Sequence, residues 1–264
     1  MRTTIRDLQK MKDKDTRIPM ITAYDYTSAA IAESAGVPII LVGDSLGMVV
    51  LGHDSTIPVT MDDMISHIQM VVRGTGKAHI VGDLPFMSYQ VSTDDALRNA
   101  GRLLKEGGCQ SVKMEGGLAI AESVQCVVQS GIPVMGHLGL TPQSVNQLGG
   151  YHVQGRTEEK AVAMLNDALA LEEAGAYAVV LELVPGNVSA TITERLRIPT
   201  IGIGAGIHCS GQVQVFHDLL GLFPDFSPKH SRRYAELGLA ATEAISGYVI
   251  DVKAREFPSE TESF

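Results

Sequence analysis

The feature that most constrains the fold of this chain is a repeated run of apolar residues of strand length. Seven runs follow one another, and each ends in glycine, proline or a polar residue: RIPMITAYD, GVPIILVGDS, KAHIVGDLP, CQSVKMEGG, GIPVMGHLG, AYAVVLELVP and RIPTIGIGAG. Strands that are apolar on both faces are typical of a parallel sheet, because helices cover both of its sides. The runs therefore predict a parallel sheet buried inside an α/β protein.

Segments with helical spacing separate most of these runs. One follows Thr60, a second follows Ser92 and Thr93, and a third ends at Gly175, at positions typical of helix caps. With GQVQVFHDLLG as an eighth strand, the alternation favours a closed (β/α)8 TIM barrel over an open sheet. No GxGxxG turn follows the first strand, which weakens a dinucleotide-binding alternative. We expect one domain over residues 1–264, with a first helix near Ile5 to Lys12 covering the bottom of the barrel.

Composition limits the partners of the chain. The net charge is −9, so no basic surface indicates nucleic acid. The three cysteines form no CxxC pair, which is typical of reduced thiols in a cytosolic protein and argues against zinc. The N-terminus lacks the apolar core of a signal peptide, and no uncharged apolar run reaches membrane-spanning length. We expect a cytoplasmic protein that binds neither nucleic acid nor membrane.

Polar residues stand where the apolar runs end. In a barrel these ends meet at one mouth, where the chemistry of barrel enzymes takes place. Asp44, Asp83 and Glu115 would bring carboxylate oxygens together there, and such ligands suit Mg²⁺. The alternative is that each acid caps a turn or pairs with Lys113.

Three further residues at the mouth have competing interpretations. Lys113 either pairs with Glu115, holds a substrate carboxylate or forms a Schiff base. His137 either bonds a backbone carbonyl or contacts substrate. Glu182 lies between two leucines; an apolar setting would raise its pKa and favour a role as base, and the alternative is a buried ion pair with Arg156 or Arg195.

The remaining features are weaker signals. The GIGAG run could bind a phosphate on its amides or serve close packing. The linker from Leu138 to Arg156 is long for a compact domain, and such loops are usually functional. Asp25, His53-Asp54 and Asp218 look structural, as a turn acid, a loop pair and the end of the eighth strand. The tail at 257–264 is expected to be a loose end.

Together, the motifs resemble the ketopantoate hydroxymethyltransferase family. The resemblance runs from about Ile21 to Gly221 and rests on ITAYDY, LVGDSLGMVVLGHDST, DLPFMSY, VKMEGG, GHLGLTPQSV, LELVP and GIGAG, which occur in the order of the family. It implies a barrel of the phosphoenolpyruvate/pyruvate-like group, Mg²⁺ as cofactor and a homodecamer. It also implies transfer of a hydroxymethyl group from 5,10-methylenetetrahydrofolate to 3-methyl-2-oxobutanoate, giving 2-dehydropantoate in pantothenate and coenzyme A biosynthesis.

The resemblance also implies residue roles. It makes Asp44, Asp83 and Glu115 the metal ligands and Glu182 the proton acceptor. The implied substrate-binding residues are Asp44, Ser45, Asp83, Lys113 and His137. Two alternatives stay open from the residues alone: a lyase or aldolase acting on another 2-oxo acid, and a binding protein without catalysis on the same barrel.

Overall fold

The computed structural model describes residues 1–223 and 228–264. Contacts divide the chain into two compact units, Met1–Val215 and Phe216–Phe264. All eight strands lie in the first unit, which we call the barrel unit. The expectation of one domain over residues 1–264 stays a prediction.

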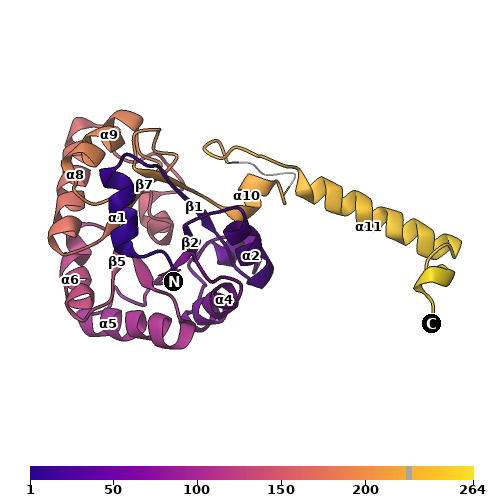
Figure 1. Ribbon diagram of the computed structural model, residues 1–264. Coiled ribbons are helices and arrows are strands. Elements are labelled where there is room, and N and C mark those ends of the chain that lie inside the picture. The colour runs from indigo at the N-terminus through magenta and orange to yellow at the C-terminus, as the bar shows by residue number, and fades with distance from the viewer. Residues whose placement is uncertain (224–227) are drawn as a thin grey trace. The chain divides into compact units, whose positions relative to one another are not determined.

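The strands of the barrel unit form a closed parallel barrel in sequence order (Figure 1). Their bounds are β1 Ile18–Thr22, β2 Ile39–Val42, β3 His79–Asp83, β4 Ser111–Glu115, β5 Val134–Gly139, β6 Ala178–Glu182, β7 Thr200–Ile203 and β8 Gly211–Gln214. The last strand pairs with the first, with Gly211 opposite Ile18, and this closes the barrel. The predicted TIM barrel and its eighth strand are confirmed.

Helices surround these strands in the order that the sequence predicts. They are α2 Tyr26–Ser34, α3 Leu46–Val49, α4 Met61–Arg73, α5 Thr93–Arg102, α6 Ala121–Gln129, α7 Val145–Leu148, α8 Glu158–Glu173 and α9 Gly186–Arg195. The side chains of Thr60 and Ser92 accept hydrogen bonds from the first turns of α4 and α5, as expected for N-caps. Gly175, just after α8, has a φ of 96°, a backbone conformation that glycine adopts without strain.

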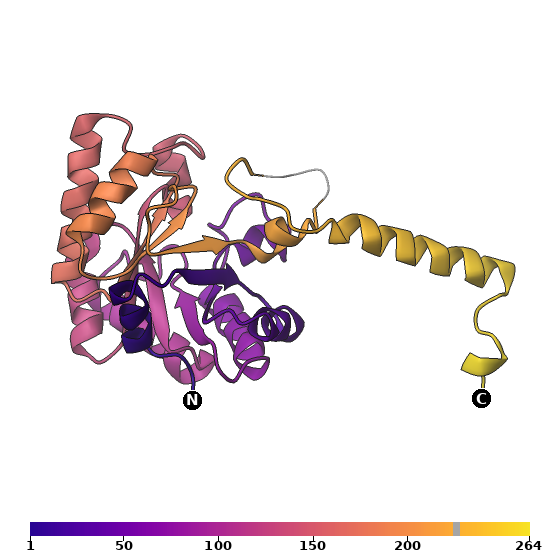
Figure 2. The same cartoon turned by 45° about the horizontal axis from the view of Figure 1, so that its top comes forward.

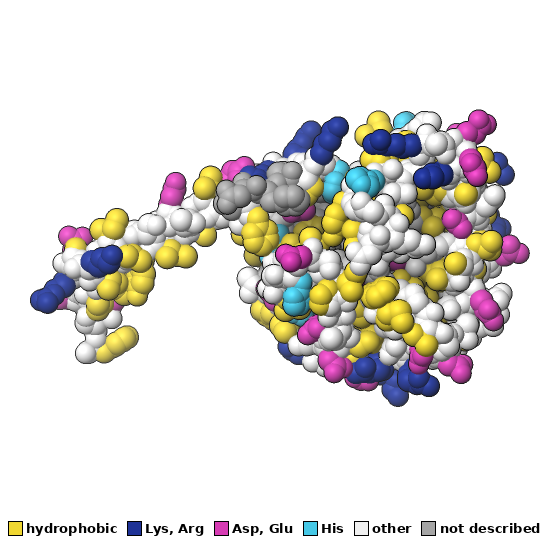
Figure 3. All heavy atoms as spheres, turned by 180° about the vertical axis from the view of Figure 1, so that it is seen from behind, with side chains coloured by type: hydrophobic (Ala, Val, Ile, Leu, Met, Phe, Trp, Pro, Cys, Tyr) yellow, Lys and Arg dark blue, Asp and Glu magenta, His cyan; other side chains and the backbone are white. Residues whose placement is uncertain are grey.

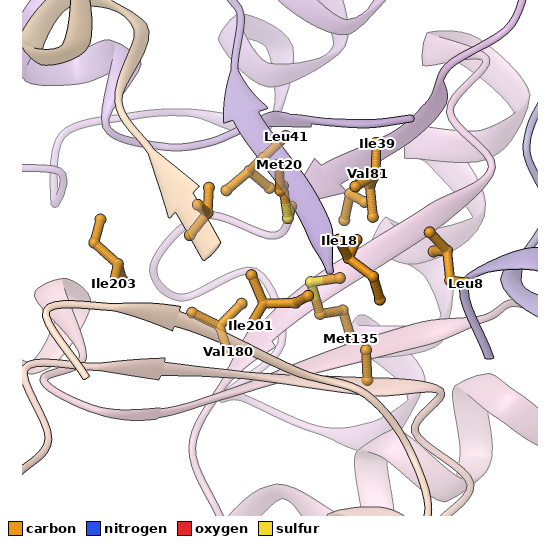
Figure 4. Close-up of a cluster of buried hydrophobic side chains, with 12 residues drawn as sticks. Leu8, Ile18, Met20, Ile39, Leu41, Val81, Met135, Val180, Ile201 and Ile203 are labelled. Carbon is orange, nitrogen blue, oxygen red and sulfur yellow. The ribbon is translucent and has the colours of Figure 1, made fainter. Parts of the chain in front are cut away.

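The first helix, α1 Ile5–Asp13, lies near the starts of the strands (Figure 2). The side chain of Leu8, in this helix, is buried in a cluster with inward-facing residues of the strands, among them Ile18, Ile39 and Met135 (Figure 4). The periodicity of two residues along a strand explains the cluster, because every second side chain faces the barrel interior. The predicted helix at the barrel bottom is confirmed.

The second unit contains α10 Phe216–Leu220, α11 Leu237–Ala254 and a 3₁₀ turn at Glu260–Glu262. Asp218 lies in α10, and β8 ends at Gln214, so the expectation that Asp218 ends the eighth strand is wrong. The tail that we expected to be loose carries the 3₁₀ turn, which Ser259 caps. Among the helices of the described residues, none has both the length and the apolar character needed to cross a membrane.

Charges are mixed over the surface. Acidic and basic side chains are both scattered over the face of the barrel unit that Figure 3 shows.

Candidate active site

The strand register gathers the polar residues at one end of the barrel. On β3 the inward positions are His79, Val81 and Asp83, and on β4 they are Ser111, Lys113 and Glu115. The register pairs Asp83 with Lys113 across β3 and β4, and Glu115 with His137 across β4 and β5. The period that buries the core therefore also turns these side chains inward at the mouth.

Five ionisable residues at the mouth are almost completely buried. Their exposed fractions are between 1% and 6%, and they are Asp44, Asp83, Lys113, Glu115 and His137. An ionised group withdrawn from water is expensive unless it is paired. The contacts between these five residues therefore decide whether the cost of burying their charges is offset.

Lys113 is the central cation of the site. Its Nζ lies 2.9 Å from Asp83 Oδ1 and 3.4 Å from Glu115 Oε1. Burial lowers the pKa of Lys113, but the charges of Asp83, Glu115 and Asp44 raise it by more. The net pKa therefore lies above its usual value. Lys113 is therefore an ammonium ion at neutral pH, and the predicted pairing with Glu115 is part of a larger cluster.

His137 connects this cluster to Glu182. Its Nδ1 lies 3.2 Å from Glu115 Oε1, and its Nε2 lies 3.2 Å from Glu182 Oε2. Burial and the charge of Lys113 lower the pKa of His137, but Glu115 and Glu182 outweigh them and raise it to about 9. Its Nδ1 also lies 3.1 Å from Lys113 Nζ, so His137 stands between the central cation of the cluster and Glu182.

Glu182 differs from the other acids in exposure and in partner. Its side chain is 16% exposed, whereas that of Glu115 is 2% exposed. We expected that Glu182, if it formed a buried ion pair, would pair with Arg156 or Arg195. In the structure its partner is His137. Glu182 thus combines a fixed orientation with access to solvent.

The acids on the other side of the cluster repel one another. Burial raises the pKa of Asp44 well above its usual value, and the charges of Asp83 and Glu115 raise it further. Burial also raises the pKa of Asp83, although Lys113 opposes the shift. Burial raises the pKa of Glu115 too, but Lys113 and His137 lower it more, and the net value lies below the usual one. The region around Asp44 is therefore short of positive charge.

Two polar residues that we did not predict belong to the site. Gln143 is 3% exposed and its Nε2 donates to Asp44 Oδ2 at 2.9 Å. The hydroxyl of Tyr89 donates to Gln143 Oε1 at 2.7 Å and accepts from the backbone N–H of Glu115 at 3.1 Å. Gln143 lies in the long linker that the sequence marked as functional, and Tyr89 ends the DLPFMSY motif, so both had an indirect signal.

The other candidate residues have local roles. Ser45 Oγ lies 2.8 Å from the hydroxyl of the buried Tyr24. Asp25 is the N-cap of α2, which agrees with its expected role in a turn. In the GIGAG run, a Cβ on Gly206 would lie 3.0 Å from the Cα of Gly186, which favours the close-packing interpretation of these glycines over a phosphate site.

The carboxylates at the mouth differ in whether their oxygens are free to bind a metal ion. Within residues 1–223 and 228–264, no group of three or more His, Cys, Asp or Glu side chains is arranged to hold one. Both oxygens of Glu115 are engaged, Oε1 by Lys113 and His137 and Oε2 by the backbone N–H of Gln143. Asp44 and Asp83 are the carboxylates on the side short of positive charge, and oxygen donors of this kind suit a hard divalent cation.

Solved structures of other proteins share this fold. The structure is similar to a phosphonopyruvate hydrolase solved in complex with oxalate and Mg²⁺, with a TM-score of 0.63, 10% sequence identity and coverage of 99% of this chain and 93% of that one. It is also similar to a 2,3-dimethylmalate lyase of the PEP mutase/isocitrate lyase superfamily, with a TM-score of 0.61, 18% identity and coverage of 100% and 92%. At such low identity these likenesses concern the fold alone.

Relatives in sequence are much closer. The chain is 61% identical over 263 residues to a 3-methyl-2-oxobutanoate hydroxymethyltransferase of Chloroflexus aurantiacus, covering 100% of this chain and 93% of the relative. It is 58% identical over 264 residues to the enzyme of that name from Dehalococcoides mccartyi, covering 100% and 94%. The family model of ketopantoate hydroxymethyltransferase matches residues 2–260. The chain therefore belongs to the ketopantoate hydroxymethyltransferase family.

Proposed function

We propose that this chain transfers a hydroxymethyl group from 5,10-methylenetetrahydrofolate to 3-methyl-2-oxobutanoate, giving 2-dehydropantoate. Its relatives at 61% and 58% identity carry the name of that activity over the full length of the chain. The observation that carries the mechanism is the continuous chain of contacts from Asp44 through Asp83, Lys113, Glu115 and His137 to Glu182. Basic side chains in the middle of this chain of contacts and a solvent-accessible carboxylate, Glu182, at one end suit proton removal from a 2-oxo acid.

Glu182 is the proposed base. The C3 proton of the oxo acid is weakly acidic because it lies next to a carbonyl group, so a positioned carboxylate is needed to remove it. His137 Nε2 lies 3.2 Å from Glu182 Oε2 and orients this side chain, and a carboxylate is the form of the group that accepts a proton. General-base catalysis of this kind typically contributes ~10²–10⁴-fold.

Lys113 and Ser45 are the proposed contacts of the oxo acid, with Asp44, Asp83 and His137 around it. The ammonium of Lys113 is fixed between Asp83 and Glu115, so it offers positive charge at a defined point to a substrate carboxylate. Ser45 has its hydroxyl oriented by Tyr24. The two residues would orient the substrate so that its C3 faces Glu182.

Mg²⁺ is the proposed cofactor, held by Asp44 and Asp83 with Glu115 beside them. When bound, the ion would act as a Lewis acid that stabilises negative charge on the 2-oxo oxygen as the proton leaves. Support comes from the charges at the mouth, where, among the residues that the structure describes, the carboxylates of Asp44, Asp83, Glu115 and Glu182 lie near two basic side chains, Lys113 and His137. A divalent cation would offset the difference.

The folate co-substrate is proposed to lie outermost, against the linker after β5. Tyr151 of this linker is 47% exposed and its hydroxyl lies 3.7 Å from Met48 Sδ. Burial raises the pKa of Tyr151, and the charges of Glu182 and Asp44 raise it further, so the linker lies within electrostatic range of both acids. An aromatic and a thioether side chain at this position suit a flat pterin ring.

A lyase or aldolase that uses a Schiff base is less consistent with the geometry. Such a reaction needs Lys113 as a free amine, and the acids around Lys113 raise its pKa. Borohydride added with substrate would trap an imine on Lys113 if this alternative were correct. We expect no covalent adduct.

The test of the proposed function follows the C3 proton directly. The protein is incubated with 3-methyl-2-oxobutanoate and Mg²⁺ in D₂O without folate, and loss of the C3 proton signal is recorded by NMR. We expect exchange that stops with a chelator and falls ~10²–10⁴-fold in Glu182→Gln. Undiminished exchange in this variant would remove Glu182 from the role of base, and binding without any exchange would indicate the non-catalytic alternative.

Assembly and location are proposed on the same basis. The family resemblance implies a homodecamer, and the three cysteines, which form no CxxC pair, favour the cytoplasm. Small molecules are the other proposed partners. Sedimentation of the purified chain at equilibrium would measure the mass, and a species of decamer mass is the expected result.

A further inference from the structure

The strongest unassigned feature of the site is the buried amide of Gln143. We propose that Gln143 is a positioning residue, which orients the carboxylates of Asp44 and Glu115 for a divalent cation by donating one uncharged hydrogen bond to each. This inference rests on the proposed function, because it assumes that these acids serve a cation. It goes beyond that function by assigning a role to a residue that the proposed function does not use.

The orientation of the Gln143 amide follows from its partners. Nε2 donates to the carbonyl oxygen of Leu84 at 2.9 Å and to Asp44 Oδ2 at 2.9 Å. Because a carbonyl oxygen can only accept, the nitrogen rather than the oxygen of the amide must face Leu84. The same choice places an N–H group against Asp44.

The other end of the amide is held equally firmly. Gln143 Oε1 accepts from the hydroxyl of Tyr89 at 2.7 Å and from Gln90 Nε2 at 3.1 Å. Two donors at the oxygen and two acceptors at the nitrogen use the full hydrogen-bonding capacity of a primary amide. The side chain therefore cannot turn over without losing four hydrogen bonds.

The backbone of Gln143 completes the arrangement. Its N–H donates to Glu115 Oε2 at 3.1 Å, so one residue occupies one oxygen of each of two acids. A lysine in this place would neutralise the acids and compete with a cation for them. An amide orients the carboxylates and leaves their charge in place, which is the role that hydrogen-bonded partners have around metal ligands.

Tyr89 connects this amide to the strand that carries Glu115. Its hydroxyl accepts from the Glu115 N–H and lies 3.1 Å from the Glu115 carbonyl oxygen. The segment after β3, the end of β4 and the linker after β5 are thus joined at one point. Loss of the Tyr89 hydroxyl would loosen the amide without touching either carboxylate.

The experiment measures binding of Mn²⁺ alone, by the EPR signal of the free ion, and then kcat and KM. In Gln143→Met we expect the Kd for Mn²⁺ to rise ~10–100-fold, the usual effect of removing a partner of a metal ligand. Tyr89→Phe should give a smaller rise. It also serves as the deciding variant if Gln143→Met does not fold.

The matched control is Gln110→Met. The side chain of Gln110 also spans two backbone groups, accepting from Ile80 N and donating to the carbonyl of Gly108, but it lies before the start of β4. We expect this variant to lose stability and keep the wild-type Kd for Mn²⁺. A purely structural Gln143 would behave in the same way.

The outcomes separate the two proposals. Folded Gln143→Met or Tyr89→Phe protein with the wild-type Kd for Mn²⁺ would overturn the positioning role alone. Wild-type protein that neither binds Mn²⁺ nor shows C3 exchange would overturn the proposed function and this inference together. A raised Kd in both variants, with a lower kcat and an unchanged Kd in the Gln110 control, supports the inference.

Discussion

Strands β3 and β4 carry buried polar pairs at both ends of the barrel, and the two pairs are built differently. At the bottom, His79 Nε2 lies 2.8 Å from the Ser111 hydroxyl, and Ser111 also contacts the hydroxyl of Tyr177 at 2.9 Å. At the mouth, Asp83 and Lys113 form an ion pair. The bottom satisfies polar atoms with neutral partners, whereas the mouth keeps charges in place.

This difference shows which end serves stability. Neutral hydrogen-bonded pairs and the cluster around Leu8 close the bottom of the barrel without buried charge. Buried ion pairs contribute little net stability, because desolvation offsets their attraction, and breaking one is costly. The charges at the mouth therefore agree with the chemistry that we propose for this end.

The largest expected effect comes from Lys113→Met at the mouth. The substitution removes the cation that pairs with Asp83 and leaves Glu115 with His137, so the free energy of unfolding in EDTA should fall by about 3–5 kcal/mol. Urea unfolding at pH 7 measures it, and Mg²⁺ should restore part of the loss. Lys10→Met, which breaks the exposed pair with Asp7, should change stability far less. Equal losses in both variants would contradict the expected difference between the buried and the exposed ion pair.

At the bottom, Leu8→Ala should lower the free energy of unfolding by about 2–5 kcal/mol, since it leaves a cavity beneath the strands. The kcat for the proposed reaction should stay unchanged at a temperature where the variant is folded. Urea unfolding and a steady-state assay on the same preparation measure both quantities. A large fall in kcat without a loss of stability would contradict the assignment of the barrel bottom to stability.

The smallest expected effect is the pH dependence that His79 imposes. Burial holds the pKa of His79 at about 4, and the charge of Arg2 also lowers it. The unfolded chain, with a pKa near ~6.5 for histidine, takes up the proton first as the pH falls. Stability from this residue is present above pH ~6.5 and is lost toward pH 4, with about 2 kcal/mol of the loss between pH 7 and pH 5.

His79→Asn provides the control for this pH dependence. Urea unfolding of both proteins at pH 7 and pH 5 isolates the contribution of His79 from that of the acids. The variant should be less stable at pH 7 and lose about 2 kcal/mol less on acidification. Parallel losses in the two proteins would show that His79 is not the group responsible.

Much of the fold could be predicted because its signals are local. The apolar runs, the caps at Thr60 and Ser92 and the glycine after α8 each depend on neighbours within a few residues, and the structure has them as expected. Asp218 was misplaced because the chain turns into α10 directly after β8. A polar residue a few positions after a strand does not by itself show where the strand ends.

Most residues of the candidate site could be predicted from the sequence, but most of the contacts between them could not. Period two along β3, β4 and β5 turns Asp83, Lys113 and His137 inward, and this was implicit in the sequence. The partner of Glu182 could not be predicted, because the sequence does not show whether an arginine or a histidine lies beside it. The pairing of β5 with β6 decides this. Gln143 was missed for the same reason, since 99 residues separate it from Asp44.

By itself, the sequence determined the order of strands and helices, the inward face of each strand and the family to which the chain belongs. Only the tertiary structure decided which of the buried charges meet, that His137 stands between Glu115 and Glu182, and that a glutamine holds Asp44. The physical reason is the range of the interactions. Burial patterns and caps act within one element, whereas contacts between charges arise only when barrel closure brings distant strand ends together.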